Sequence, residues 1–203
     1  MGDVDFIIQL LEELSAFNSS NELYYSVFSI EQLLKNVAIS FAISLDTNEA
    51  DIEFSSSISD SLGEFTGDKI KLQELVLNLL KNAEEAITEQ GSIHLAASRS
   101  GDIITITCTD TGCGITPEQM ECIFQPFVTY KPGGTGLGLA FSRKIAEAHE
   151  GTLTAVSTPQ ESTTLPLHFL SRHVPSVIQK HGCQKSTDQP AHTGRIVYAC
   201  TGK

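Results

Sequence analysis

The hydrophobic and polar positions of this chain fall into blocks that predict alternating helices and strands. Apolar residues spaced three or four apart predict helices over residues 5–17, 30–45, 69–89 and 136–149. Short apolar or alternating runs predict strands over residues 23–28, 51–55, 92–98, 103–109, 152–157 and 164–170. Gly101-Asp102 indicates a hairpin turn, Thr116 before Pro117 indicates a helix start, and residues 55–67 read as a polar loop.

These elements predict an α+β fold, a two-layer α/β sandwich with a mixed sheet and the helices on one face. The length of 203 residues, 40% of them hydrophobic, favours one domain with extensions. We assign that domain to residues 21–170. Residues 1–20 form a separate amphipathic segment, and residues 171–203 are predicted to be a linker or disordered tail because their polar sequence has no period.

Composition narrows the class of protein. The formal net charge is -12, and the residues after position 171 hold five Lys or Arg against one acid, so the preceding body is even more acidic than the whole. Such a body argues against binding to nucleic acid or to an anionic membrane surface. The five cysteines include no CxxC pair, which predicts a reducing, cytoplasmic setting. No apolar run is long enough to span a membrane, and the N-terminus lacks the features of a signal peptide.

Asn78 and Asn82 are the first candidate functional residues. They lie four residues apart in a predicted helix and therefore project from the same face. Two asparagines in an apolar helix can simply be satisfied core residues. An amide oxygen is also a hard ligand suited to Mg²⁺, and the two motifs that follow in the chain favour this second interpretation.

Asp110 follows a predicted strand and precedes Gly112 and Gly114. A carboxylate there can accept a hydrogen bond from an exocyclic amine, which would select adenine over guanine. Glycines let the backbone turn tightly and approach a flat base. Taken alone, the motif is better explained as an ordinary Asp-x-Gly turn.

A glycine-rich segment opens the last predicted helix and comprises Gly133, Gly134, Thr135, Gly136, Leu137 and Gly138. Backbone amides at a helix N-terminus attract phosphate, and glycines allow close approach. The strand and the acidic residue of a Rossmann fingerprint are missing. Lys131 can either reach a terminal phosphate or remain an exposed loop lysine. Together the three motifs predict a site for a purine nucleotide with Mg²⁺.

The motifs resemble those of the catalytic, ATP-binding domain of sensor histidine kinases, in the superfamily shared with gyrase, the heat-shock chaperone and mismatch-repair ATPases. Residues 72–86 resemble the N box, 110–115 the G1 box, 123–129 the F box and 133–140 the G2 box of that family. The resemblance covers roughly residues 5–170.

The resemblance implies a Bergerat-type sandwich that binds ATP and Mg²⁺, with Asn82 as the metal ligand, Asp110 as the adenine anchor and residues 116–135 as a mobile lid. A threonine behind the adenine matches Thr163 or Thr164 loosely. No catalytic residue is assigned. The implied ATP-binding residues are Asn78, Asn82, Asp110, Gly112, Gly114, Ile115, Phe127, Thr129, Lys131, Gly133, Gly134, Thr135, Gly136, Leu137, Gly138 and Thr164.

Asn78 also bears on the reaction. Hydrolysing members of the superfamily are expected to carry a glutamate one helical turn before the metal-binding asparagine, and this chain has Asn78 there; neither Glu74 nor Glu85 matches the position. Without a base to activate water, transfer to an external acceptor is favoured. We therefore expect a protein-histidine kinase. The alternatives are an ATP-hydrolysing clamp and a non-catalytic nucleotide-sensing module.

The phosphoacceptor is expected to come from elsewhere. No histidine precedes residue 94, and His149-Glu150 ends a helix before Gly151, so we interpret His149 as structural. Residues 1–20 resemble the last turns of a dimerisation helix without its histidine. The expected partner is a histidine-bearing dimerisation domain, in the parent chain or in trans, and through it a response regulator. That parent can be soluble or membrane-anchored.

Overall fold

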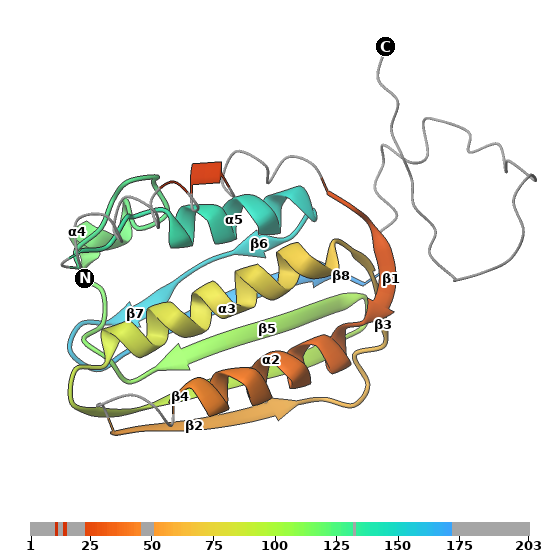
Figure 1. Ribbon diagram of the computed structural model, residues 1–203, viewed down its shortest axis with the longest axis horizontal. Coiled ribbons are helices and arrows are strands. Elements are labelled where there is room, and N and C mark those ends of the chain that lie inside the picture. Colours follow the sequence, from red (N-terminus) through yellow and green to blue (C-terminus); the bar gives the residue numbers. More distant parts are fainter. Residues whose placement is uncertain (1–10, 12–13, 16–22, 46–50, 132, 172–203) are drawn as a thin grey trace, which may run out of the picture.

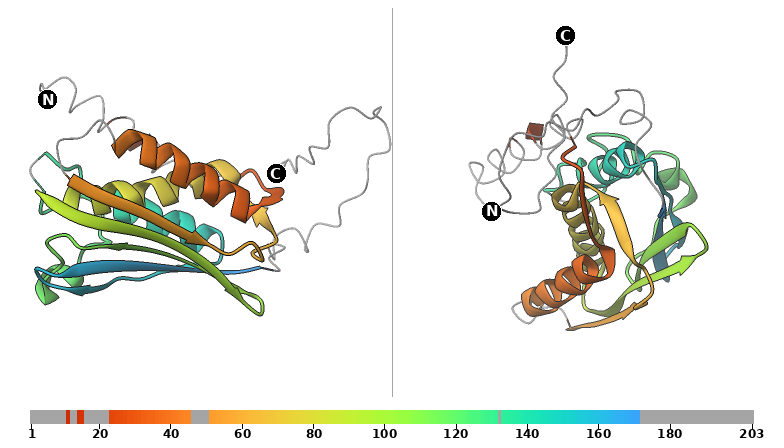
Figure 2. Two further views of the ribbon diagram at one scale, coloured as in Figure 1. Left: turned by 90° about the horizontal axis from the view of Figure 1, so that it is seen from below. Right: turned by 90° about the vertical axis from the view of Figure 1, so that its right-hand side faces the viewer.

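The main body of the protein is a two-layer α+β sandwich (Figure 1). The computed structural model describes residues 11, 14–15, 23–45, 51–131 and 133–171. Its helices are α2 (Ile30–Leu45), α3 (Lys69–Ala86), α4 (Pro117–Met120) and α5 (Gly138–Ala148). Figure 2 shows α2, α3 and α5 on the same face of the sheet, so the predicted fold class is confirmed.

Helix α3 lies in the middle of the helical layer and packs against both α2 and α5. Its buried residues recur every three or four positions, which places one apolar stripe against the sheet: Leu72, Leu75, Val76, Leu79, Leu80 and Ala83. Asp68 caps its N-terminus by accepting from the N–H groups of Ile70 and Lys71. The helix ends at Ala86, three residues before the predicted end, because Ile87 turns to an extended conformation.

The main sheet is mixed. Its order is β2 (Asp51–Ile58), β4 (Gln90–Ser100), β5 (Ile103–Asp110), β8 (Ser162–Leu170) and β6 (Thr152–Leu153), with β7 (Val156–Thr158) also paired to β8. Strands β2 and β4 run parallel, and the other pairs are antiparallel. A separate pair joins β1 (Ser26–Ser29) to β3 (Glu64–Gly67).

The alternation of side chains along β5 matters most for the site. Ile104, Ile106 and Cys108 point into the core, and the next residue in that row is Asp110. On the neighbouring strand, Thr163 continues the row of buried residues and is paired with Asp110. The row of core residues therefore ends in two polar side chains, at the C-terminal end of β5 and the N-terminal end of β8.

The predicted polar loop over residues 55–67 is wrong at both ends. Residues 55–58 continue β2, and residues 64–67 form β3. The polar residues Ser55 and Ser57 made this edge strand read as a loop in the sequence. Their hydroxyls form hydrogen bonds with the two ring nitrogens of His94 on β4 at 2.8 and 2.7 Å. The predicted strand 152–157 is divided into β6 and β7, and the strand predicted at 23–28 is found at Ser26–Ser29.

The extensions fall largely outside the described residues. Of the helix predicted over residues 5–17, the structure describes Leu11, Leu14 and Ser15, all helical. Residues 172–203 lie outside the described part, so the domain limits stay predictions. In the described part, none of the helices is long and apolar enough to cross a bilayer, and no group of three or more His, Cys, Asp or Glu side chains is arranged to hold a metal.

Candidate nucleotide-binding site

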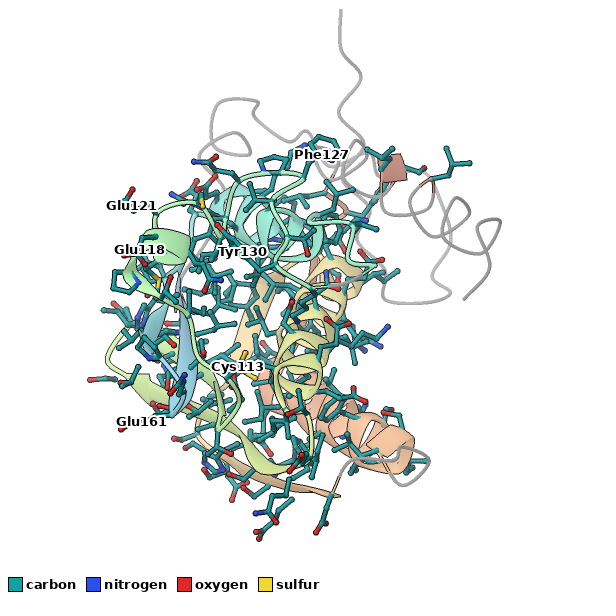
Figure 3. The ribbon with its side chains drawn as sticks, turned by 90° about the vertical axis from the view of Figure 1, so that its left-hand side faces the viewer. Cys113, Glu118, Glu121, Phe127, Tyr130 and Glu161 are labelled. Carbon is teal, nitrogen blue, oxygen red and sulfur yellow. The ribbon has the colours of Figure 1, made fainter. Side chains whose placement is uncertain are left out.

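Four elements end at the same edge of the molecule: the C-terminal ends of α3 and β5, helix α4, and the N-terminal end of α5 (Figure 1). Figure 3 views this edge, with Phe127 and Tyr130 on the segment between α4 and α5 and Cys113 on the turn after β5. Because Pro117–Met120 of the expected lid form α4, we use the name lid below for residues 121–131 and 133–137. The edge gathers the three motifs that the sequence holds far apart.

Asn82 lies on the last turns of α3. Its Nδ2 donates to the backbone oxygen of Asn78 at 2.8 Å, one helical turn earlier, and this bond fixes the orientation of the amide. The opposite atom, Oδ1, accepts from Nζ of Lys131 at 3.2 Å. An amide oxygen held toward a cation is the arrangement that a Mg²⁺ ligand requires, so Asn82 fits the expected metal.

Asp110 is buried, with 3% of its surface exposed. Its Oδ1 accepts from the Gly112 N–H at 2.9 Å. Burial raises the pKa of the carboxyl group, while the bond from Gly112 and the positive charge of Lys131 oppose that rise. A desolvated carboxylate with few partners is a strong acceptor for the amine of a bound base.

The turn after Asp110 is wedged between α3 and the loop before β8. The Cys113 N–H donates to the Ala86 oxygen at 3.0 Å, and the Gln160 N–H donates to the Cys113 oxygen at 2.8 Å. Gly114 has a φ of 68°, and a Cβ there would overlap the Thr158 oxygen. Only glycine fits, which explains the second glycine of the motif.

The lid begins after α4, which starts as predicted at Pro117 and carries a capping box between Thr116 and Gln119. Its two ends meet where the Phe127 N–H donates to the Gly136 oxygen at 3.0 Å. Gly136 has a φ of 70°, and a Cβ there would lie 2.6 Å from the Phe127 carbonyl carbon. Phe127 itself has a φ of 66°, a strained value for an aromatic residue.

The N-terminus of α5 faces Asn82. A Cβ built on Gly138, the first residue of α5, would lie 3.5 Å from Asn82 Nδ2. The first turn of α5 holds no acidic residue, so the positive end of the helix dipole is not neutralised by its own side chains. This end is suited to receive phosphate next to a metal held by Asn82.

Lys131 reaches α3 from the lid, and its side chain, although 36% exposed, has several partners there. Its Nζ contacts the backbone oxygen and Oδ1 of Asn82 at 3.2 Å each, and Glu85 at 2.7 Å. The neighbouring backbone is held by a bond from the Lys131 N–H to the Thr129 hydroxyl at 3.2 Å. Glu85 is a site residue that sequence reasoning did not include, because its partner lies on a distant loop.

The structure distinguishes Thr163 from Thr164. Thr163 is paired with Asp110 on the inward face, and its hydroxyl lies 3.0 Å from Ser157 Oγ. Thr164 lies on the opposite face of the sheet, with its hydroxyl 3.0 Å from that of Thr109. Of the two threonines, Thr163 is therefore the one that lies beside Asp110, and Thr164 faces away from it. Ser157, which also accepts from the Ile115 N–H at 2.9 Å, was missed. The alternation of Leu165, Leu167 and Phe169 along β8 could have placed Thr163 on the inward face, but it gives no sign of Ser157.

The remaining predicted residues lie in the last part of the lid, just before α5. Thr135 Oγ1 accepts from the Leu137 N–H at 3.4 Å, and the Gly134 N–H donates to the Lys131 oxygen at 3.2 Å. The side chain of Leu137 is buried, whereas Gly133 is exposed. These residues lie in one short segment that leads into α5.

His149 is a structural residue. It is 1% exposed, and its Nδ1 lies 2.8 Å from the Ile145 oxygen while Nε2 accepts from the Asp68 N–H at 2.9 Å. The ring also packs near Tyr25, Phe65 and Phe169. A buried imidazole with both nitrogens engaged joins the end of α5 to the start of α3 and presents no free nitrogen to a phosphate.

The family model described as histidine kinase-, DNA gyrase B-, and HSP90-like ATPase matches residues 67–173. Sensor histidine kinase ZraS of Escherichia coli (strain K12) is 39% identical over 125 residues, which cover 62% of this chain and 27% of ZraS. The chain thus spans about a quarter of the length of the curated relatives it matches.

Solved structures share the fold. Full-length ShkA in complex with AMPPNP has a TM-score of 0.72 at 26% identity, over 84% of this chain and 37% of that chain. The catalytic domain of histidine kinase ThkA has a TM-score of 0.63 at 26% identity, over 72% of this chain and 95% of that chain. The resemblance inferred from the sequence motifs is confirmed by these comparisons.

Proposed function

Because this chain belongs to the family of histidine kinase-, DNA gyrase B- and HSP90-like ATPases, we propose that it is the ATP-binding catalytic domain of a sensor histidine kinase. One observation carries the proposal: Asn82, Lys131 and the N-terminus of α5 meet at the edge where Asp110 ends β5. The related structure of ShkA holds AMPPNP, which supports a nucleotide at the corresponding edge here.

Each group has a task that its surroundings suit. Asp110 accepts from the adenine amine, and Thr163 lies beside it in the pairing of β5 with β8. The N-terminus of α5 and Lys131 attract the phosphates, while Asn82 would hold Mg²⁺ through its amide oxygen. When bound, Mg²⁺ neutralises negative charge on the phosphate oxygens.

The positions of the carboxylates on α3 favour phosphoryl transfer over hydrolysis. Asn78 occupies the position one turn before Asn82, where an activating glutamate would be needed. Glu74 is paired with Lys71 at 3.1 Å, and Glu85 with Lys131 at 2.7 Å. Since neither is placed to activate water, the γ-phosphoryl group is transferred to a histidine on a dimerisation domain, in the parent chain or in trans, and from there to a response regulator. The site works where ATP and reduced thiols are found, in the cytoplasm.

The test combines three measurements on one preparation. Titration calorimetry with ATP and Mg²⁺ reports binding, phosphate release reports hydrolysis, and ATP radiolabelled on its γ-phosphate reports transfer to a separately purified histidine-bearing dimerisation segment of ZraS. We expect binding, acid-labile label on that segment, and little hydrolysis. Asn82→Ala serves as the binding-deficient control.

Each alternative has its own signature in the same test. Steady-state hydrolysis that Asn82→Ala abolishes, without label on the segment, would establish an ATP-hydrolysing clamp. Binding of ATP with neither hydrolysis nor transfer would indicate a nucleotide-sensing module. Absence of binding by folded protein would refute the nucleotide site altogether.

A further inference from the structure

The contact between Lys131 and Glu85 lies inside the proposed site, and no role in nucleotide binding accounts for the glutamate. Nζ of Lys131 lies 2.7 Å from Glu85 Oε2 and 3.2 Å from Asn82 Oδ1. The side chains of Lys131 and Glu85 are 36% and 58% exposed. The ammonium group therefore covers the oxygen that we assign to Mg²⁺.

A lysine ammonium and Mg²⁺ cannot share this oxygen, because both are cations that need to approach it closely. Nucleotide binding must therefore move Lys131 away from Asn82. The charge of Lys131 is still useful once phosphates arrive, since the same lid segment leads into the helix N-terminus that receives them. Lys131 thus has two alternative sets of anionic partners, and Glu85 belongs to the nucleotide-free set.

Glu85 contributes little to the fold itself. It lies in the last turn of α3, where no basic residue of the helix is present, and a negative charge is unfavourable at this end of the helix dipole. The preceding residue, Glu84, is also acidic, and its raised pKa is caused first by burial and then by the charge of Glu85. The charge of Lys81, on the same helix, opposes that rise for Glu84, whereas Glu85 is paired with Lys131 of the lid.

We propose that Glu85 sets nucleotide affinity by competing with the phosphates for Lys131, and that the Glu85–Lys131 pair holds the lid lysine over the metal-binding oxygen of Asn82 until nucleotide binds. This inference rests on the proposed ATP site. It makes Glu85 an internal competitor: removal of its charge should strengthen nucleotide binding although it removes a contact from the folded protein.

The experiment is a double-mutant cycle on ATP affinity, measured by titration calorimetry with Mg²⁺ present. The variants are Glu85→Gln, Lys131→Met and the two combined, with Glu84→Gln as the matched control that removes one carboxylate from the same helical turn. Because an exposed ion pair has a modest free energy, we expect Glu85→Gln to lower the Kd for ATP by about two- to fivefold. In the Lys131→Met background the same change should have no effect.

Each outcome decides the inference. Tighter binding by Glu85→Gln that disappears without Lys131, together with an unchanged Kd for Glu84→Gln, supports it. Unchanged or weaker binding by Glu85→Gln overturns it, and so does an equal gain in the Lys131→Met background, which would reveal a general effect of charge. If the unaltered protein binds no ATP, the proposed function itself is refuted, and this result is distinct from a failed prediction for Glu85→Gln.

Discussion

Replacement of Asp110 by asparagine should separate nucleotide binding from folding. The carboxylate is 3% exposed and already accepts from the Gly112 N–H at 2.9 Å, with a further backbone hydrogen bond from Thr163. Asparagine has a single acceptor oxygen, so its amide would present N–H groups to the adenine amine. A hydrogen bond to a charged group contributes roughly 1.5–3 kcal/mol, which corresponds to a loss of about 10- to 150-fold in ATP affinity.

The stability of the nucleotide-free protein should change in the opposite direction. Burial raises the pKa of Asp110 above its ordinary value of 3.8, so the folded state disfavours the ionised carboxylate at neutral pH. A neutral asparagine side chain at this position carries no such cost, and Asp110→Asn should melt above the unaltered protein at pH 7. As the pH falls through the raised pKa toward 3.8, Asp110 becomes protonated and the advantage should shrink.

Calorimetric titration with ATP and with GTP, and thermal melts between pH 7 and pH 4, provide the measurements. The unaltered protein should prefer ATP over GTP, and Asp110→Asn should lose that preference. Unchanged ATP affinity in a folded variant would refute the assignment of Asp110 to adenine. A lower melting temperature at pH 7 would refute the argument from desolvation.

Three further substitutions test other parts of the site and fold. Asn82→Ala should abolish the gain in ATP affinity that Mg²⁺ provides, with little change in the melting temperature, whereas Asn82→Asp should retain the gain; titrations with and without Mg²⁺ check this. Gly136→Ala should weaken ATP binding in the same titrations far more than Gly133→Ala, because a Cβ at Gly136 would collide with the Phe127 backbone. A Cβ at Gly133 meets nothing within 4 Å and adds only the left-handed strain of about 1–2 kcal/mol. Equal effects would contradict a role for the contact between Phe127 and Gly136 in shaping the lid. His149→Phe should lower the free energy of unfolding by about 1–3 kcal/mol, because the buried Asp68 N–H loses its acceptor. Transfer to the dimerisation segment should persist below the melting temperature of the variant. Loss of transfer from folded protein would contradict a structural role for His149.

The sequence was sufficient to predict the fold class because the buried rows follow simple periods. The helical stripe of α3 and the alternation of β5 are visible in the chain, and together they point Asp110 and Asn82 toward the same layer. Strand β2 was cut short because its outward residues are serines, and their hydrogen bonds to His94 depend on a parallel neighbour that no local pattern reveals.

Finer features of the site depended on register and on distant contacts. A shift of one residue decides whether Thr163 or Thr164 faces the core, and only the pairing of β5 with β8 shows that Thr163 lies opposite Asp110. The bond between Lys131 and Glu85 joins residues separated by 46 positions, and it depends on the path of the lid. The motifs therefore predicted which segments meet, whereas the partners of each side chain required the three-dimensional arrangement.

The backbone bond between Phe127 and Gly136 has a consequence for the timing of ligand exchange. It ties the lid at its base like an Ω-loop, so we expect residues 128–131 and 133–135 to move as one flap while α5 keeps its first turn. Entry and departure of a ligand then leave the apolar layer beneath undisturbed. Changes within the flap should alter residence time without altering heat resistance, which leaves evolution free to adjust one without the other.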